Sequence, residues 1–208
     1  IISDDASTDD SVNFIRKNYP DIKLILSSHN QGFSKTVNSG IQQASKALVL
    51  LLNSDVKLKE DYFQYQWKYF ELPDTFGVMG SIWTEDERKL MDAAKYPVWK
   101  GGQLRSTVNY KLKQKSSEPC LTLFLSGANA LINRGKLLTL KGMDERYSPY
   151  YMEDVDLSVR AWRMGWKCYY EPDAICYHKL SETISNHNTQ KKIKHISKRN
   201  KFIFHDTH

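Results

Sequence analysis

The sequence predicts an α/β fold with a Rossmann-like, mostly parallel sheet flanked by helices. Short apolar segments alternate with segments of helical periodicity over residues 1–52, which is the order of a sheet built with right-handed crossovers. Residues 47–52 are purely aliphatic, as in strands buried on both faces of a parallel sheet. Acidic and polar clusters follow the apolar segments, at the strand ends where open parallel sheets bind ligands.

The first elements can be placed in order. Ile1-Ile2-Ser3 reads as the end of a strand, so we expect sequence before residue 1. Val12, Ile15 and Tyr19 fall on one face of a helix, and the Tyr19-Pro20 step ends it. The next elements are a strand at 22–26, a helix at about 34–45 and a strand at 47–52.

The rest of the chain continues with both element types. Asp156 and Arg160 are four residues apart on an expected helix at 153–164, where they can pair, and Gly165 suits its C-terminal cap. Residues 84–118 are polar and are expected to form an irregular insertion. The other expected elements are a helix at 60–70, strands at 76–83, 166–170 and 174–177, and apolar segments at 121–125 and 128–132.

Composition restricts the class of protein. The 208 residues suffice for one domain with a core, and 40% hydrophobic content excludes a disordered chain. The net charge of +6 favours an anionic partner, but motifs that read bases or stack on RNA are absent, so nucleic acid is not expected. Three cysteines without a C-x-x-C pair indicate reduced thiols in a cytosolic protein. Neither a membrane span nor a signal peptide is visible.

A basic tail at 191–208 follows the expected domain at 1–190. Six Lys and Arg side chains lie between positions 191 and 201, with Ile193, Ile196 and Ile203 near helical spacing among them. The tail is therefore either a helix for an anionic membrane surface or a solvated helix that packs its isoleucines on the domain.

Glu153-Asp154-Val155-Asp156 is the densest acidic cluster. Carboxylates this close raise one another's pKa, which a fold rarely needs but a general base or a cation site does. Pairing with Arg160 gives Asp156 a structural explanation. The helix dipole favours acids in a first turn, and it explains one of Glu153 and Asp154 more easily than both.

Other candidate residues lie at strand ends. Asp4 or Asp5 could accept hydrogen bonds from a base or ribose, although a turn with a helix cap explains residues 4–9 about as well. Asp55 could hold a divalent cation that neutralises a diphosphate, although a polar triplet after a strand is also an ordinary loop. His178 follows a strand and could join Asp55 at that cation or be structural. Gly40, inside a helix, suggests close backbone packing or ligand approach.

In this order the motifs resemble those of the family 2 glycosyltransferases, inverting enzymes of the GT-A fold that use nucleotide-diphosphate sugars. The resemblance covers nearly the whole chain. His178 followed by Ser181 resembles a feature of rhamnosyltransferase-like members. The segments that match the family are Asp4-Asp5-Ala6-Ser7-Thr8-Asp9, Asn30-Gln31-Gly32-Phe33, Asn38-Ser39-Gly40, Leu52-Asn53-Ser54-Asp55, Gly127-Ala128-Asn129-Ala130, Gly142-Met143-Asp144-Glu145 and Glu153-Asp154-Val155-Asp156-Leu157.

The resemblance implies a role for each matched site residue. Asp154, with Glu153, would be the general base for the acceptor hydroxyl. A divalent cation, Mn or Mg, would stabilise the departing diphosphate. The expected set is Asp154 and Glu153 for catalysis, Asp4, Asp5, Gly32 and Asn38 for the nucleotide, and Asp55, Asn53 and His178 for the cation.

Two departures from the family pattern matter. Asn53 stands where the metal-binding triplet usually begins with Asp, which leaves one carboxylate for the cation. The family's first strand, with its T-[YF]-N turn at the nucleotide site, is absent from these 208 residues. Whether these 208 residues alone bind the donor is therefore a question for experiment.

The function expected from the sequence is a hexosyl- or deoxyhexosyltransferase of cell-surface glycan synthesis. Its partners would be a nucleotide-diphosphate sugar donor and a glycan or glycolipid acceptor. It would work in the cytoplasm, with the basic tail as a means of peripheral attachment to the inner face of the membrane. The alternative is a non-catalytic nucleotide- or anion-binding domain.

Overall fold

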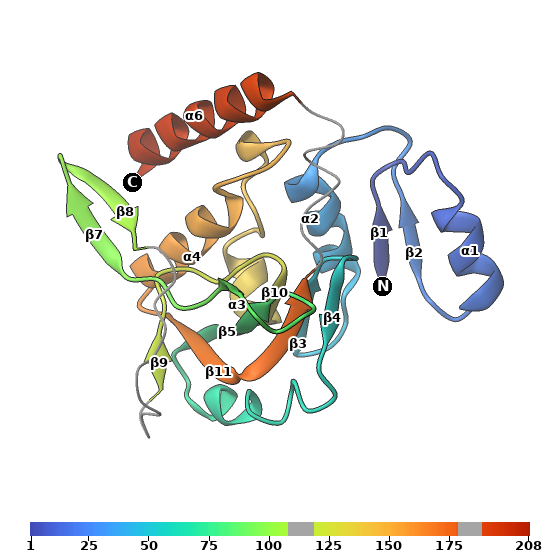
Figure 1. Ribbon diagram of the computed structural model, residues 1–208, viewed down its shortest axis with the longest axis horizontal. Helices are drawn as coiled ribbons and strands as arrows, with labels where there is room; N and C mark the ends of the chain where they lie inside the picture. Colours follow the sequence, from blue (N-terminus) through green and yellow to red (C-terminus); the bar gives the residue numbers. More distant parts are fainter. Residues whose placement is uncertain (108–118, 179–188) are drawn as a thin grey trace.

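The computed structural model describes residues 1–107, 119–178 and 189–208, and its centre is a seven-stranded sheet (Figure 1). The helix α4 (Glu153–Arg163) lies on one side of this sheet. The segment that connects β4 (Val56–Leu58) to β5 (Thr75–Trp83) lies on the other side. The strand order is β3 (Leu48–Leu52), β10 (Asn129–Asn133), β5 (Thr75–Trp83), β11 (Lys167–His178) and β4 (Val56–Leu58), with β6 (Leu90–Asp92) beside β5 and β9 (Cys120–Leu121) beside β11.

The α/β class is confirmed, but the prediction of a mostly parallel sheet is wrong. Of the strand pairs described in this sheet, only β5 and β11 run parallel. The strand β10 lies antiparallel between β3 and β5 and separates them. The aliphatic run at 47–52 indicates a strand with apolar side chains on both faces, and such a run carries no information about the direction of its partner.

A second, small sheet holds the first strands of the chain. The strand β1 (Ile2–Asp4) pairs in parallel with β2 (Leu24–Leu26), and α1 (Ser11–Asn18) connects them. The helix α2 (Phe33–Gln43) packs on β1. A Cβ on Gly40 would lie 2.8 Å from the hydroxyl of Ser3, so the close packing expected at Gly40 is present.

Two other predicted elements take different forms. Residues 60–66 are turns, followed by the 3₁₀ helix η1 (Trp67–Glu71), because the backbone here bonds across three residues, as from Gln66 N–H to the Phe63 carbonyl. The two strands expected at 166–170 and 174–177 are one strand, β11, with a register shift between Glu171 and Ile175. The expected insertion contains β6 and a hairpin of β7 (Pro97–Lys100) and β8 (Gln103–Ser106), while its residues 108–118 lie outside the described part.

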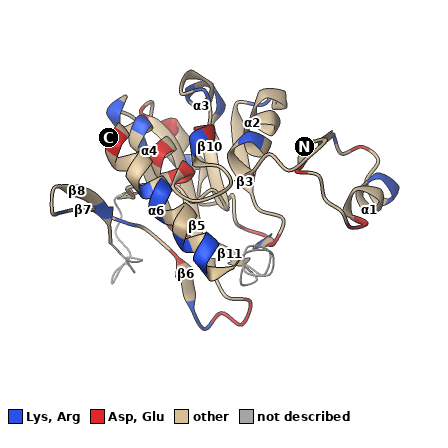
Figure 2. Ribbon diagram, turned by 90° about the horizontal axis from the view of Figure 1, so that it is seen from above, with Lys and Arg blue, Asp and Glu red and all other residues tan. Residues whose placement is uncertain are grey.

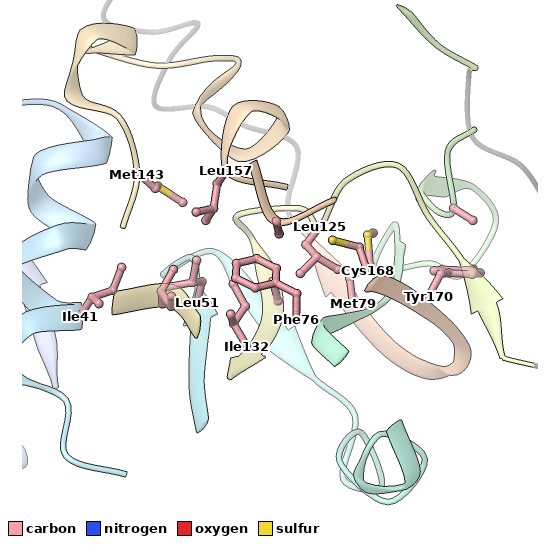
Figure 3. Packing of buried hydrophobic residues seen from close by; sticks show 14 of the residues in the cluster. Ile41, Leu51, Phe76, Met79, Leu125, Ile132, Met143, Leu157, Cys168 and Tyr170 are labelled. Atoms are coloured by element: carbon pink, nitrogen blue, oxygen red, sulfur yellow. The ribbon is translucent and has the colours of Figure 1, made fainter. Parts of the chain in front are cut away.

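The main core lies between the sheet and the helices α2, α3 (Arg134–Thr139) and α4. Figure 3 shows side chains from these elements converging, and all those labelled are buried. Cys168 belongs to this core and Cys176 to a neighbouring cluster, and both thiols are free, as expected. The labelled residues are Ile41, Leu51, Phe76, Met79, Leu125, Ile132, Met143, Leu157, Cys168 and Tyr170.

The basic tail forms α6 (Gln190–Thr207), which packs on the domain. Ile196 and Phe204 are buried, and Ile203 packs beside Phe204 against Tyr147 and Val159. The helix is capped by Thr189, whose hydroxyl accepts from the Lys192 N–H. In the part of the chain that the structure describes, no helix is both long and apolar enough to cross a membrane.

Candidate active site

The first turn of α4 contains three carboxyl groups, and two of them are buried. Tyr151 and Met152 precede the helix with φ angles of 77° and 78°, and this turn directs Glu153 inward. Glu153 is 7% exposed and Asp156 is fully buried. Asp154, between them, is half-buried.

Both oxygens of the Asp156 carboxylate have hydrogen-bonding partners. Arg160 donates to it at 2.8 Å, which confirms the expected pair, and His208 lies 2.9 Å from its other oxygen. The Tyr147 hydroxyl also donates to that second oxygen, at 3.3 Å. These contacts give Asp156 a structural role, since a buried carboxylate is tolerated when it is paired and hydrogen-bonded.

Glu153 and Asp154 form a pair in unequal environments. The Oε2 atom of Glu153 is buried with no hydrogen-bond partner among the described residues. Burial and the charge of Asp154 raise the pKa of Glu153 to about 8. Burial also raises the pKa of Asp154, but the N–H groups of Val155 and Gly127 and the nearby ammonium of Lys95 oppose that rise. Burial therefore favours the protonated form of Glu153 at neutral pH, while the groups around Asp154 partly offset the effect of burial on its carboxyl.

The backbone before the pair is held by α6. The amide of Asn200 is fully buried and donates to the carbonyl oxygens of Tyr147, Tyr150 and Tyr151 at 2.6, 2.9 and 2.9 Å. Arg199 donates to the carbonyl of Ser148. Arg199, one of the six basic residues of the tail, and its neighbour Asn200 thus position the start of α4.

The residues expected to bind the nucleotide make contacts within the protein. The Asp5 carboxylate accepts from the N–H groups of Gln31 and Gly32 at 2.7 and 2.9 Å, so it holds the loop before α2. The Asp4 carboxylate accepts from Ser7 N–H at 3.0 Å. The Asn38 amide bonds both the N–H and the carbonyl of Met143, each at 2.8 Å.

Gly32 meets a steric requirement beside these contacts. Its φ is +87°, and a Cβ there would lie 2.9 Å from the Ser148 hydroxyl and 3.0 Å from the backbone of Pro149. Only glycine adopts this conformation readily and leaves room for that approach. Gly32 therefore allows the loop before α2 to pack against residues 148–149.

Two residues of the expected cation set lie together. Nε2 of His178, at the end of β11, is 3.1 Å from Oδ2 of Asp55, which precedes β4. Asn53 begins the same turn, and its N–H donates to the Ala128 carbonyl. Among the described residues, no three His, Cys, Asp or Glu side chains gather closely enough to hold a metal ion by themselves. Ser181 lies outside the described residues.

Residues 127–128 connect the cation candidates to the carboxyl pair. The backbone of Gly127 helps to lower the pKa of Asp154, and the carbonyl of the next residue, Ala128, accepts from the Asn53 N–H. The polar triplet after β3 and the start of α4 therefore meet at one turn before β10. This placement suits a reaction in which a cation-bound group leaves and a base acts beside it.

Sequence reasoning missed Lys95 and Asn200. Lys95 is a single lysine in a segment read as an irregular insertion, and nothing in its neighbourhood distinguishes it. Asn200 stands four residues from both buried Ile196 and buried Phe204. That i, i+4 and i+8 spacing could have placed Asn200 on the packed face of the helix.

Comparison with known proteins identifies relatives across most of the chain. Residues 1–140 match the family model described as glycosyl transferase family 2. N-acetylglucosaminyl-diphospho-decaprenol L-rhamnosyltransferase of Mycobacterium tuberculosis is 24% identical over 88% of this chain and 67% of its own length.

Solved structures show the same fold at low identity. GalNAc-T7 with UDP, GalNAc and Mn²⁺ has a TM-score of 0.65 at 14% identity, covering 84% of this chain and 36% of the other. The mannosyltransferase PcManGT of Pyrobaculum calidifontis, with GDP-Man and Mn²⁺, has a TM-score of 0.61 at 17% identity over 86% of this chain. The chain spans 47% of that second protein, so both likenesses concern the GT-A fold of a part of each.

The environment of Glu153 predicts a pH-dependent stability difference between the wild type and Glu153→Gln. Because folding raises the pKa of Glu153 from 4.5 to about 8, the wild type loses stability relative to the neutral variant as pH rises between these values. The difference in unfolding free energy should be near zero below pH 4.5 and on the order of 5 kcal/mol above pH 8. Urea unfolding at several pH values measures it, with the exposed Glu85→Gln as control. A difference that does not change with pH would contradict the burial of an acidic proton at Glu153.

Proposed function

Because the chain belongs to glycosyl transferase family 2, we propose that it transfers a hexosyl or deoxyhexosyl group from a nucleotide-diphosphate sugar to a hydroxyl of a glycan or glycolipid, with inversion at the anomeric carbon. The observation that carries this proposal is the carboxyl pair at the start of α4, in which Asp154 is half-buried beside the buried Glu153. The chain spans 67% of the mycobacterial relative, so the activity concerns a protein that includes this segment.

Asp154 is suited to take a proton from the acceptor hydroxyl. A general base is most effective when its pKa lies near the working pH, and burial moves the pKa of Asp154 upward from its ordinary value. The acceptor oxygen then forms a bond to the anomeric carbon as the bond from that carbon to the diphosphate oxygen breaks. Protonated Glu153 limits the pair to one negative charge, which the Val155 and Gly127 N–H groups stabilise.

Asp55, Asn53 and His178 fit a divalent cation in part. Asp55 and His178 present an oxygen and a nitrogen 3.1 Å apart, and Asn53 belongs to the same turn. Mn²⁺ or Mg²⁺ takes more ligands than these, so donor phosphate oxygens and water would complete the set. Such an ion, when bound, neutralises charge that develops on the leaving diphosphate. The Mn²⁺ named with both solved structures supports this assignment.

The donor's nucleotide would lie over the loops that follow β1 and precede α2. Asp4 is the candidate for contact with the base, since it lies half-buried at the carboxyl end of β1. Asp5, Gly32 and Asn38 would shape this site by holding the loops in place, as their internal contacts indicate. The lipid-linked acceptor in the name of the mycobacterial relative supports a glycolipid acceptor and a role in cell-surface glycan synthesis.

The first test replaces the base. Asp154→Asn should lower turnover by roughly 10²–10⁴-fold, the scale of general-base loss, with little change in donor affinity. Release of nucleotide diphosphate from UDP-, GDP- and dTDP-linked sugars in Mn²⁺ or Mg²⁺ measures both quantities, with the exposed Asp86→Asn as control. Near-normal turnover would remove the role from Asp154. Donor binding without hydrolysis or transfer by the wild type would favour a non-catalytic nucleotide-binding domain.

The second test concerns the cation. With only one carboxylate in the set, metal binding to the free protein should be weak and should strengthen with nucleotide diphosphate. Asp55→Ala should abolish the metal-dependent part of nucleotide binding, while Asp86→Ala leaves it intact. Calorimetric titration of Mn²⁺, with and without nucleotide diphosphate, measures the effect. Tight Mn²⁺ binding to the free protein that survives Asp55→Ala would contradict the assignment.

The outer face of α6 is a candidate for contact with an anionic membrane. Its apolar side is occupied by the domain, while four lysines three or four residues apart are exposed, as is Phe202 at 73%. Figure 2 shows basic positions along α6. Attraction to acidic lipid is about 1 kcal/mol per lysine near the surface. A membrane site for the enzyme would bring it to a lipid-linked acceptor. The four lysines are Lys191, Lys194, Lys198 and Lys201.

Co-sedimentation with vesicles tests this surface. Replacing these four lysines by Gln should weaken binding to anionic vesicles by roughly 10²-fold or more at low salt. Neutral vesicles should bind neither protein. The matched control replaces four exposed lysines elsewhere, Lys17, Lys57, Lys89 and Lys100, and so removes the same net charge. Equal loss in both quadruple variants would show a net-charge effect with no role for α6.

A further inference from the structure

The hairpin of β7 and β8 exposes a tryptophan beside cationic side chains. Trp99 is 70% exposed and its neighbour Val98 is 42% exposed. Lys100 and Arg105 are also exposed, and the sequence of residues 97–106 contains no acidic side chain. An apolar side chain stabilises a fold when it leaves water. Val98 and Trp99 therefore contribute little to the core, and the fold alone does not explain them.

A two-residue turn and backbone hydrogen bonds shape this hairpin. Gly101 and Gly102 form the turn with φ angles of 61° and 72°, and positive φ angles at both positions match the turn to the twist of the strands. At the base, the Thr107 N–H donates to the Tyr96 carbonyl and the Tyr96 N–H donates to the Thr107 hydroxyl, both at 3.0 Å. Trp99 is therefore held near the end of an element that projects from the domain (Figure 1).

The hairpin lies beside the C-terminal half of α6. Leu104 on β8 and Ile203 on α6 pack against one buried cluster, which contains Phe204. Trp99 pairs with Leu104 across the hairpin, and residues directly opposite each other in an antiparallel pair lie on the same face. Phe202, which precedes Ile203, is 73% exposed. The hairpin and the outer face of α6 therefore border the same part of the surface.

The two elements also share the sign of their charge. Between positions 191 and 201, α6 carries six Lys and Arg side chains, and Asp206 is the only acid in its sequence. The hairpin adds Lys100 and Arg105. Acidic lipid headgroups attract such cations, and tryptophan favours the boundary between headgroups and acyl chains. A neutral glycan could pack on the tryptophan but would offer no charge to the cations, so an anionic bilayer is the better match.

We propose that the β7–β8 hairpin inserts Trp99 into the headgroup boundary of an anionic membrane while the lysines of α6 bind its surface. The inference rests on the membrane contact of α6 given under the proposed function, and it adds an apolar anchor to that contact. Salt screens the attraction between lysines and acidic lipid, whereas it does not screen the transfer of an apolar side chain out of water. The two contributions therefore differ in their dependence on salt.

Co-sedimentation over a series of salt concentrations tests the anchor, with vesicles of phosphatidylcholine and phosphatidylglycerol. Trp99→Ala should lower the partition coefficient by roughly tenfold, the scale of one large apolar side chain, by the same factor at each salt concentration. Trp99→Phe should restore most of the binding. Trp67→Ala is the matched control, because Trp67 is 52% exposed on η1, away from α6 (Figure 1). Equal binding of Trp99→Ala and the wild type would overturn the proposal.

Tryptophan fluorescence locates the side chain directly. The difference in emission between the wild type and Trp99→Phe isolates Trp99 from the other tryptophans of the chain. This difference should shift to shorter wavelength when anionic vesicles are added, and lipids brominated on their acyl chains should quench it. An emission from Trp99 that neither shifts nor is quenched, in a protein that sediments with the vesicles, would place the hairpin outside the bilayer and overturn the proposal.

Activity distinguishes the membrane anchor from a contact with the acceptor. With a soluble acceptor and no vesicles, Trp99→Ala should keep the KM and kcat of the wild type. A higher KM for the acceptor together with unchanged vesicle binding would make Trp99 a glycan contact and overturn the proposal. The vesicle assays need neither donor nor turnover, so a protein without transferase activity that still inserts Trp99 would remove the proposed function and leave this inference standing.

Discussion

The position of residues 142–152 is the constraint on which the site depends. Three separate parts of the chain hold this segment. Asn38 on α2 bonds both backbone groups of Met143, Gly32 makes room for Ser148, and Asn200 on α6 binds three carbonyl oxygens from Tyr147 to Tyr151. A buried carbonyl oxygen without a hydrogen-bond donor costs about 1–3 kcal/mol of folding free energy. The three hydrogen bonds from Asn200 therefore join α6 to the rest of the domain. The start of α4, and with it the carboxyl pair, takes its place from this segment.

Burying the carboxyl groups of Glu153, Asp154 and Asp156 costs free energy. The surrounding groups offset that cost to a different degree for each of them. Asp156 is bonded by Arg160, His208 and the Tyr147 hydroxyl, and Asp154 accepts from the Val155 N–H. The buried Oε2 of Glu153 has no hydrogen-bond partner among the described residues. One helical turn therefore holds a paired acid, an acid with one backbone donor and an acid whose burial favours the neutral form. Their different protonation follows from their surroundings, since the side-chain chemistry of Asp and Glu is nearly the same.

Local patterns in the sequence predicted local features well. The helix of the acidic cluster, the Asp156–Arg160 pair and the proximity of His178 to Asp55 all follow from spacing or strand-end position. The direction of β10 did not follow, because an apolar run looks the same in parallel and antiparallel pairs. Lys95 and Asn200 make contacts with segments distant in sequence. Neither the residue type nor the adjacent sequence indicates such contacts. The nucleotide and cation roles stay predictions.

The small sheet of β1 and β2 has a consequence for the thermodynamics of ligand recognition. None of the residues of β1, α1 and β2 is fully buried, and this sheet does not pair with the seven-stranded one. Segments with few buried contacts open at lower free-energy cost than a packed core. A ligand that bridges Asp4 and Asp55 must therefore order this unit as it binds. Part of the interaction free energy between ligand and protein then offsets the conformational entropy that this unit loses. Ligand binding should therefore show a large unfavourable entropy beside a favourable enthalpy.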